Sequence, residues 1–247
     1  MNDHLEPLRV ECDRFAAAIT GADEGAPVPC CPAWDLRELV SHLGRVQRFW
    51  AGVIRRGADV DPERPGDDVR PGAGDDLVAW FRSGAADLLA AVAEAPADRP
   101  AWTWWAAPRT AGAIARHQVQ EAAVHRWDAD TAAGRTPAPV DAGAAADAVE
   151  EFLSAALPDI HGDDPWPGSD GVVELVATDV AGATRWVVLG GERPVPAPDR
   201  PPSVTVSVAG TASDLLLLLY RRVPLEGLAV TGDEGFATAF ADWLAVE

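Results

Sequence analysis

The sequence predicts an α+β protein, in which an antiparallel four-helix bundle is followed by a smaller α+β domain with a short, mainly antiparallel sheet. Two observations support this fold class. Apolar residues recur at helical spacing through most of the first 130 residues, whereas runs rich in β-branched residues appear only after residue 170. Because helices and strands are segregated along the chain, we expect two domains, residues 1–138 and residues 139–247.

Each helix expected in the first domain carries apolar residues on one face. The four helices are expected at residues 5–19, 36–56, 76–95 and 110–133. Asp35 precedes the second helix and Glu38 follows three positions later. This spacing is typical of a capping box, in which each side chain accepts a hydrogen bond from an amide of the first turn. Four helices joined by short to moderate links predict an antiparallel bundle.

The expected second domain mixes helices and strands. Two β-branched runs, residues 171–179 and 184–191, are separated by "VAGA", which predicts a hairpin. The proline-rich "RPVPAPDRPP" that follows predicts a link. Two further strands are expected at residues 203–210 and 228–233, and helices at residues 141–160, 211–223 and 234–244.

Composition limits the partners. The formal net charge is −19, and an acidic surface repels phosphates, so we expect neither nucleic acid nor a membrane as partner. All 20 basic residues are arginine, which excludes a Schiff base on a protein lysine. The three cysteines lack metal-site or redox spacing, and the first residues contain no apolar segment of a signal peptide. We therefore expect a cytoplasmic protein.

The stretch "RHQVQEAAVHRWD" places His117, Glu121 and His125 four residues apart. Residues four apart on a helix lie about 40° apart around its axis, so Glu121 and His125 can bind one metal ion. His117 lies about 80° from His125, so we do not expect it to join them. A third ligand must come from elsewhere, and His42 on the second helix is the candidate. The alternative is a surface pair at Glu121 and His125 and a buried structural histidine at His42.

Two segments carry a family resemblance. "VPCCPAWDLRELVSHLGRV" resembles a signature with a Cys-Pro-x-Trp turn and a Leu-Val-x-His-Leu helix, and "RHQVQEAAVHRWDAD" resembles the matching signature with Glu, His, Arg and Asp. Together they are similar to the maleylpyruvate isomerase family of mycothiol-dependent enzymes, whose first domain is a DinB-like four-helix bundle. "VAGTASDLLLLLYRRV" and "LAVTGDEGF" resemble that family's C-terminal domain. The resemblance spans nearly the whole chain and is not specific for a substrate.

The resemblance implies that His42, Glu121 and His125 bind zinc or another divalent metal. It also implies that the thiol cofactor mycothiol occupies an open metal position as a thiolate. In an isomerase the thiolate adds to a cis double bond, the resulting single bond rotates, and elimination gives the trans acid. A thiol transferase would use the same activated sulfur. Two alternatives stay open: a hydrolase that uses zinc-bound water, and a regulatory protein that binds a metal or a small acid without turnover.

An unsaturated dicarboxylic substrate requires cationic partners, and the arginine fork matches a carboxylate. We expect Arg45 and Arg116 to bind the cofactor and Arg222 to be catalytic; the alternative for each is a solvated surface arginine. The cluster Trp102, Trp104 and Trp105 either lines the entrance or seals the end of the bundle. The expected partners are a small-molecule substrate and the thiol, and the protein is expected to be a monomer or a homodimer.

Overall fold

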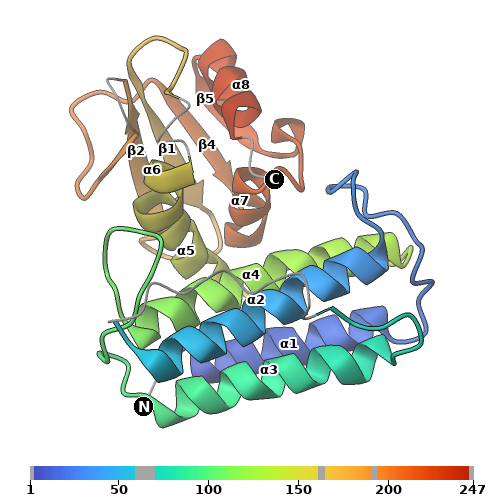
Figure 1. Cartoon of the computed structure of the whole chain (residues 1–247). Coiled ribbons are helices and arrows are strands. Elements are labelled where there is room, and N and C mark those ends of the chain that lie inside the picture. The colour runs from blue at the N-terminus through green and yellow to red at the C-terminus, as the bar shows by residue number, and fades with distance from the viewer. Residues whose placement is uncertain (1–2, 59–69, 161–164, 191–193, 245–247) are drawn as a thin grey trace. The chain divides into compact units, whose positions relative to one another are not determined.

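The computed structural model describes residues 3–58, 70–160, 165–190 and 194–244. The chain divides into two compact units, residues 1–138 and residues 139–247. The first unit consists of four long helices that lie along one another (Figure 1). They are α1 (Leu5–Ile19), α2 (Leu36–Arg56), α3 (Leu77–Glu94) and α4 (Ala111–Ala132). These bounds agree with the predicted helices to within two residues at each end. No described helix is both long and apolar enough to cross a bilayer.

The start of α2 is fixed by the predicted capping box. The backbone amide of Glu38 donates to the carboxylate of Asp35 over 2.8 Å, and the amide of Asp35 donates to the Glu38 side chain over 3.3 Å. These two bonds satisfy amides that have no partner within the helix. Because the helix begins at this point, His42 lies on its second turn with its side chain partly buried.

The helices α2 and α3 run in the same direction. Arg48 donates to the carbonyl of Trp80 over 2.6 Å, and about two turns further on Arg55 contacts the Asp87 carboxylate over 2.7 Å. The link of residues 57–76 is long enough for this arrangement. A fully extended chain of 20 residues can reach about 66 Å, which exceeds the length of about 32 Å that the 21 residues of α2 span. A link of this length is long enough for α3 to begin at the same end of the bundle as α2.

The helices α1 and α4 are likewise parallel to each other. Arg126 of α4 contacts Glu11 of α1 over 3.3 Å, and Arg135 after α4 donates to the carbonyl of Ala17 over 3.2 Å. In Figure 1, α2 and α4 run in opposite directions. The predicted bundle is confirmed, and its parallel pairs, α1 with α4 and α2 with α3, distinguish it from a simple alternation of up and down helices.

The second unit contains a five-stranded sheet with the strand order β3-β2-β1-β4-β5. Its strands are β1 (Gly171–Ala177), β2 (Thr184–Leu189), β3 (Val195–Ala197), β4 (Val206–Gly210) and β5 (Ala229–Gly232). The predicted hairpin β1–β2 is present, β1 and β4 pair in parallel, and the other pairs are antiparallel. The mainly antiparallel sheet is therefore confirmed, whereas β3 lies in the stretch that was expected to be only a link.

Helices complete the second unit. They are α5 (Ala142–Glu151), α6 (Leu157–Ile160), α7 (Ala212–Leu219) and α8 (Glu234–Trp243), with a π-helical turn at Phe152–Ala156 and a 3-10 turn at Leu225–Gly227. Every leucine of α7 is buried. The backbone of Arg221 turns left-handed (φ 58°) just after α7, so the chain leaves the helix there and Arg222 follows.

Candidate metal centre and adjoining cavity

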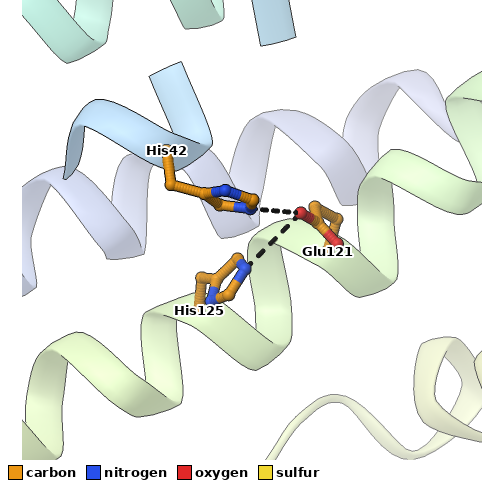
Figure 2. Close-up of side chains that lie close together, drawn as sticks. All are labelled: His42, Glu121 and His125. Carbon is orange, nitrogen blue, oxygen red and sulfur yellow. Dashed lines mark hydrogen bonds and ion pairs between the residues drawn. The ribbon is translucent and has the colours of Figure 1, made fainter. Parts of the chain in front are cut away.

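Three side chains of the first unit converge on one point (Figure 2). His42 comes from α2, and Glu121 and His125 come from α4. One carboxylate oxygen of Glu121 lies 3.1 Å from Nε2 of His42 and 3.4 Å from Nε2 of His125. One potential ligand atom from each residue lies within 4.8 Å of the others. The structure thus brings together the three residues that the sequence proposes as metal ligands.

The spacing of these atoms fits a tetrahedral metal ion. Two ligands that each lie about 2.1 Å from such an ion are about 3.4 Å apart. The two contacts of Glu121 are close to this separation, and two imidazoles with one carboxylate are a ligand set that zinc accepts. The donor set and its spacing therefore fit a divalent metal with at least one position left for a further ligand.

His125 is oriented by a second carboxylate. Its Nδ1 lies 2.9 Å from an oxygen of Asp128, one turn further along α4. When the Nδ1 proton is donated to Asp128, the other ring nitrogen, Nε2, faces Glu121 and the candidate metal position. A carboxylate behind a histidine ligand fixes its tautomer and increases its basicity. The Asp128 side chain is fully buried, so this orientation is held inside the bundle.

The electrostatics of the metal-free cluster follow from these contacts. Burial raises the pKa of Glu121, but the charges and hydrogen bonds of His125 and His42 outweigh it and hold this pKa well below its ordinary value. Burial lowers the pKa of His125, but the Glu121 charge and the Asp128 hydrogen bond outweigh it and raise the pKa to about 9. Both ring nitrogens of His125 therefore carry a proton at neutral pH when no metal is bound.

Trp34 lies against the rings of His42 and His125. The centre of its indole ring lies 4.7 Å from the His42 ring and 6.1 Å from the His125 ring. It directly precedes Asp35, so the capping box that starts α2 also fixes this ring. Trp34 ends the Cys-Pro-x-Trp turn that the sequence shows, but this motif did not predict that its ring lies beside His42 and His125.

A cavity of about 360 Å³ adjoins the cluster. It is lined by His42, Arg45, Val46, Phe49, Trp50, Trp102, Trp104, His117 and Glu121. Both expectations for the tryptophan cluster are met in part: Trp102 and Trp104 line the cavity, whereas Trp105 is buried and its indole N–H donates to the carbonyl of Pro108 over 2.8 Å. The cavity gives a small molecule access to the position between the ligands.

Comparison with known proteins identifies the family. The model of the mycothiol maleylpyruvate isomerase N-terminal domain matches residues 5–130, and the model of the C-terminal domain of the same family matches residues 143–238. The chain belongs to the mycothiol maleylpyruvate isomerase family. The resemblance expected from the sequence is thereby confirmed, and with it the expectation of an enzyme of this family.

Two crystal structures of the mycothiol-dependent maleylpyruvate isomerase, one of them a histidine-to-alanine mutant, share the fold. Their TM-scores are 0.66 and 0.65, at 13% sequence identity over 93% of this chain and 92% of each of theirs. At this identity the likeness supports the fold alone. No curated protein matches the chain.

The arginines proposed from the sequence lie in different surroundings. Arg45 lines the cavity beside the ligands. Arg116 is half-buried on α4 and is not among the residues that line this cavity. Arg222 lies in the second unit, within the part that matches the C-terminal domain of the isomerase family, and lines a separate cavity of about 720 Å³ there. Its guanidinium donates to the carbonyl of Tyr220 over 2.8 Å.

Proposed function

We propose that the chain is a zinc-dependent, mycothiol-dependent isomerase or thiol transferase that acts on a small electrophilic, unsaturated acid. His42, Glu121 and His125 would hold the metal. The observation that carries the proposal is the convergence of these three donors, within 4.8 Å of one another, beside a cavity of about 360 Å³. Membership of the mycothiol maleylpyruvate isomerase family supports mycothiol as the thiol.

The metal, when bound, lowers the pKa of a coordinated thiol and so provides a thiolate at neutral pH. The residues of the chain have separate tasks. Glu121 neutralises part of the metal charge, and Asp128 holds the proton on Nδ1 of His125 so that Nε2 faces the metal. Trp34 and the aromatic lining of the cavity keep water away from the reacting sulfur.

We also propose that the two domains are residues 1–138 and 139–247, and that three arginines bind anionic groups or take part in the reaction. Arg45 would bind an anionic group in the cavity, since it lines the space next to His42. We propose Arg116 as a further cofactor-binding residue and Arg222 as the catalytic contribution of the second domain. A reduced thiol cofactor and the buried thiol of Cys12 both fit a cytoplasmic enzyme.

A metal-dependent hydrolase is less well supported. Such an enzyme often uses a carboxylate near the open metal position to accept a proton from the attacking water. Among the described residues that line the cavity, Glu121 is the only carboxylate, and it is a proposed metal ligand. The geometry therefore favours a reaction that depends on a thiolate over one that depends on activated water.

Cobalt substitution tests the proposal directly. The cobalt-loaded protein should develop a sulfur-to-cobalt charge-transfer band when mycothiol is added, and zinc with mycothiol should raise the melting temperature more than zinc alone. His42→Ala should abolish the band. Arg82→Ala, which changes an exposed arginine of α3, is the matched control and should retain it. A wild-type protein that binds neither cobalt nor zinc, or that binds metal without any band from mycothiol, would refute the proposal.

A further inference from the structure

The cavity beside the metal ligands has an uneven lining. Its wall away from the ligands is mainly aromatic, formed by Phe49, Trp50, Trp102 and Trp104. The remaining polar groups outside the ligand set are Arg45 and His117. A cavity of this volume lies at the small end of the range for small-molecule sites. We therefore expect the lining to discriminate between acids by the shape and polarity of the portion of the acid molecule that lies away from its reacting double bond.

The aromatic rings are arranged to accept a flat group. The ring centres of Phe49 and Trp50 are 4.9 Å apart, and Trp102 lies 6.2 Å from each of them with its ring nearly perpendicular to Phe49. Trp104 is the most exposed of these rings, at 39%. A planar ligand can complete such a set of edge-to-face and offset contacts, because the ring separations lie within the favourable range.

The charges of the lining match a single acidic group. Among the described residues that line the cavity, Arg45 is the one permanently cationic side chain. A second carboxylate would meet indole and phenyl rings and the imidazole of His117, none of which carries a permanent positive charge, and a carboxylate without a charged partner is costly to bury. A monoacid leaves no such group, since its one carboxylate can bind the Arg45 guanidinium.

We propose that this cavity binds planar, conjugated or aromatic acids with one carboxylate in preference to small diacids. This inference rests on the proposed function, because it names the substrate class of the same site. The aromatic wall holds the flat part of the substrate, Arg45 holds its carboxylate, and the double bond lies toward the metal ligands. The residues that set this preference are Phe49, Trp102 and Trp104.

Calorimetry with two probe acids tests the inference. The probes are cinnamate, a planar conjugated monoacid, and maleate, a small diacid, each titrated into the full chain both free of metal and loaded with zinc. Cinnamate should bind at least about tenfold more tightly than maleate, because several aromatic contacts together are worth a factor of this size. Measurement without metal makes the outcome independent of whether the zinc site is correct.

Variants identify where the acids bind. Trp104→Leu should weaken cinnamate about fivefold and leave maleate unchanged, and Phe49→Leu should act in the same direction. Arg45→Gln should weaken both acids. Trp186→Leu changes a partly exposed tryptophan of β2 in the other unit and should alter neither affinity. Because Trp104 is the most exposed ring of the wall, its variant should fold.

The outcomes separate this inference from the proposed function. Maleate binding as tightly as cinnamate overturns the inference, most clearly if Arg222→Gln weakens maleate, since a second arginine would then serve the second carboxylate. Zinc and mycothiol binding without any cinnamate binding also overturns it and leaves the proposed function intact. Cinnamate binding that depends on Trp104, in a protein that takes up no zinc, supports the preference of the cavity and refutes the proposed metal chemistry.

Discussion

His117 and His125 lie two turns apart on α4, yet their surroundings are opposite. His125 contacts two carboxylates, those of Glu121 and Asp128, and its pKa is raised to about 9. His117 has indole rings around it and a hydrogen bond to Gln120 over 3.1 Å. Both are buried to a similar degree. Among the described contacts, the neighbouring carboxylates of His125, rather than burial or residue type, distinguish this proposed metal ligand from His117 on the same helix.

Removal of the shared carboxylate should have the largest effect. Glu121→Ala leaves two imidazoles without the anion between them, and zinc affinity should fall more than about 100-fold, because even residues that only orient a ligand contribute 10–100-fold. Because alanine favours the helix, the total helix content measured by circular dichroism should not change. Competition with a chelating dye measures the affinity. A folded variant with wild-type zinc affinity would contradict the assignment, and a variant that never folds would indicate a structural role.

The protonation of His125 should make zinc binding strongly dependent on pH. Zinc must displace a proton whose pKa is about 9 in the metal-free protein, so the apparent affinity should rise about tenfold per pH unit well below pH 9, and about 50-fold from pH 7 to pH 9. Calorimetry in buffers of different ionisation enthalpy should detect about one released proton near pH 7. Affinity that is flat over this window would show that His125 is already neutral or is not a ligand.

The same proton should have the opposite effect on the metal-free fold. The folded-state pKa of His125 lies above its ordinary value of 6.5, so its contribution to the free energy of unfolding is fully present below pH 6.5 and is lost as the pH rises through about 9. Urea denaturation of the metal-free protein should therefore show stability falling over the window in which zinc affinity rises. Parallel trends would contradict the assigned charge state.

Asp128→Asn should have an intermediate effect. The amide keeps the size of the carboxylate but removes the charge behind His125, so zinc affinity should fall about tenfold. The pH at which zinc binding reaches its plateau should also move lower, because Asp128 helps to raise the pKa of His125. Asp130→Asn is the matched control, since Asp130 lies on the same helix and pairs with Arg126 rather than with a ligand. Equal losses in the two variants would point to a general effect of charge.

Local sequence patterns predicted the helices and two of the three proposed ligands. The capping box at Asp35 and Glu38 set the start of α2, and the four-residue spacing of Glu121 and His125 set one face of α4. Both are short-range features that a helix fixes by itself. The choice of His42 needed only the expectation that an apolar helical face points into the bundle.

The features that escaped prediction depend on contacts between distant segments. The length of the link permits the parallel direction of α2 and α3, and contacts such as Arg48 to Trp80, which no local pattern encodes, stabilise it. The short strand β3 has only three residues within a proline-rich stretch and forms because β2 offers a free edge. The aromatic wall combines rings of α2 with Trp102 and Trp104 from a loop some fifty residues later.

The smallest effect on the metal should come from His117→Ala, which matches the ligand variants in residue type and helix. His117 contacts aromatic rings and Gln120 and lies about 80° around the helix from His125, so zinc affinity should change by less than about twofold. The variant should instead widen the cavity and alter the binding of cinnamate. Chelator competition and calorimetry on the same preparation measure both. A loss of zinc affinity comparable to that in Glu121→Ala would mean that the ion lies nearer to the aromatic wall. His117 would then be a metal ligand, and its contrast with His125 would be wrong.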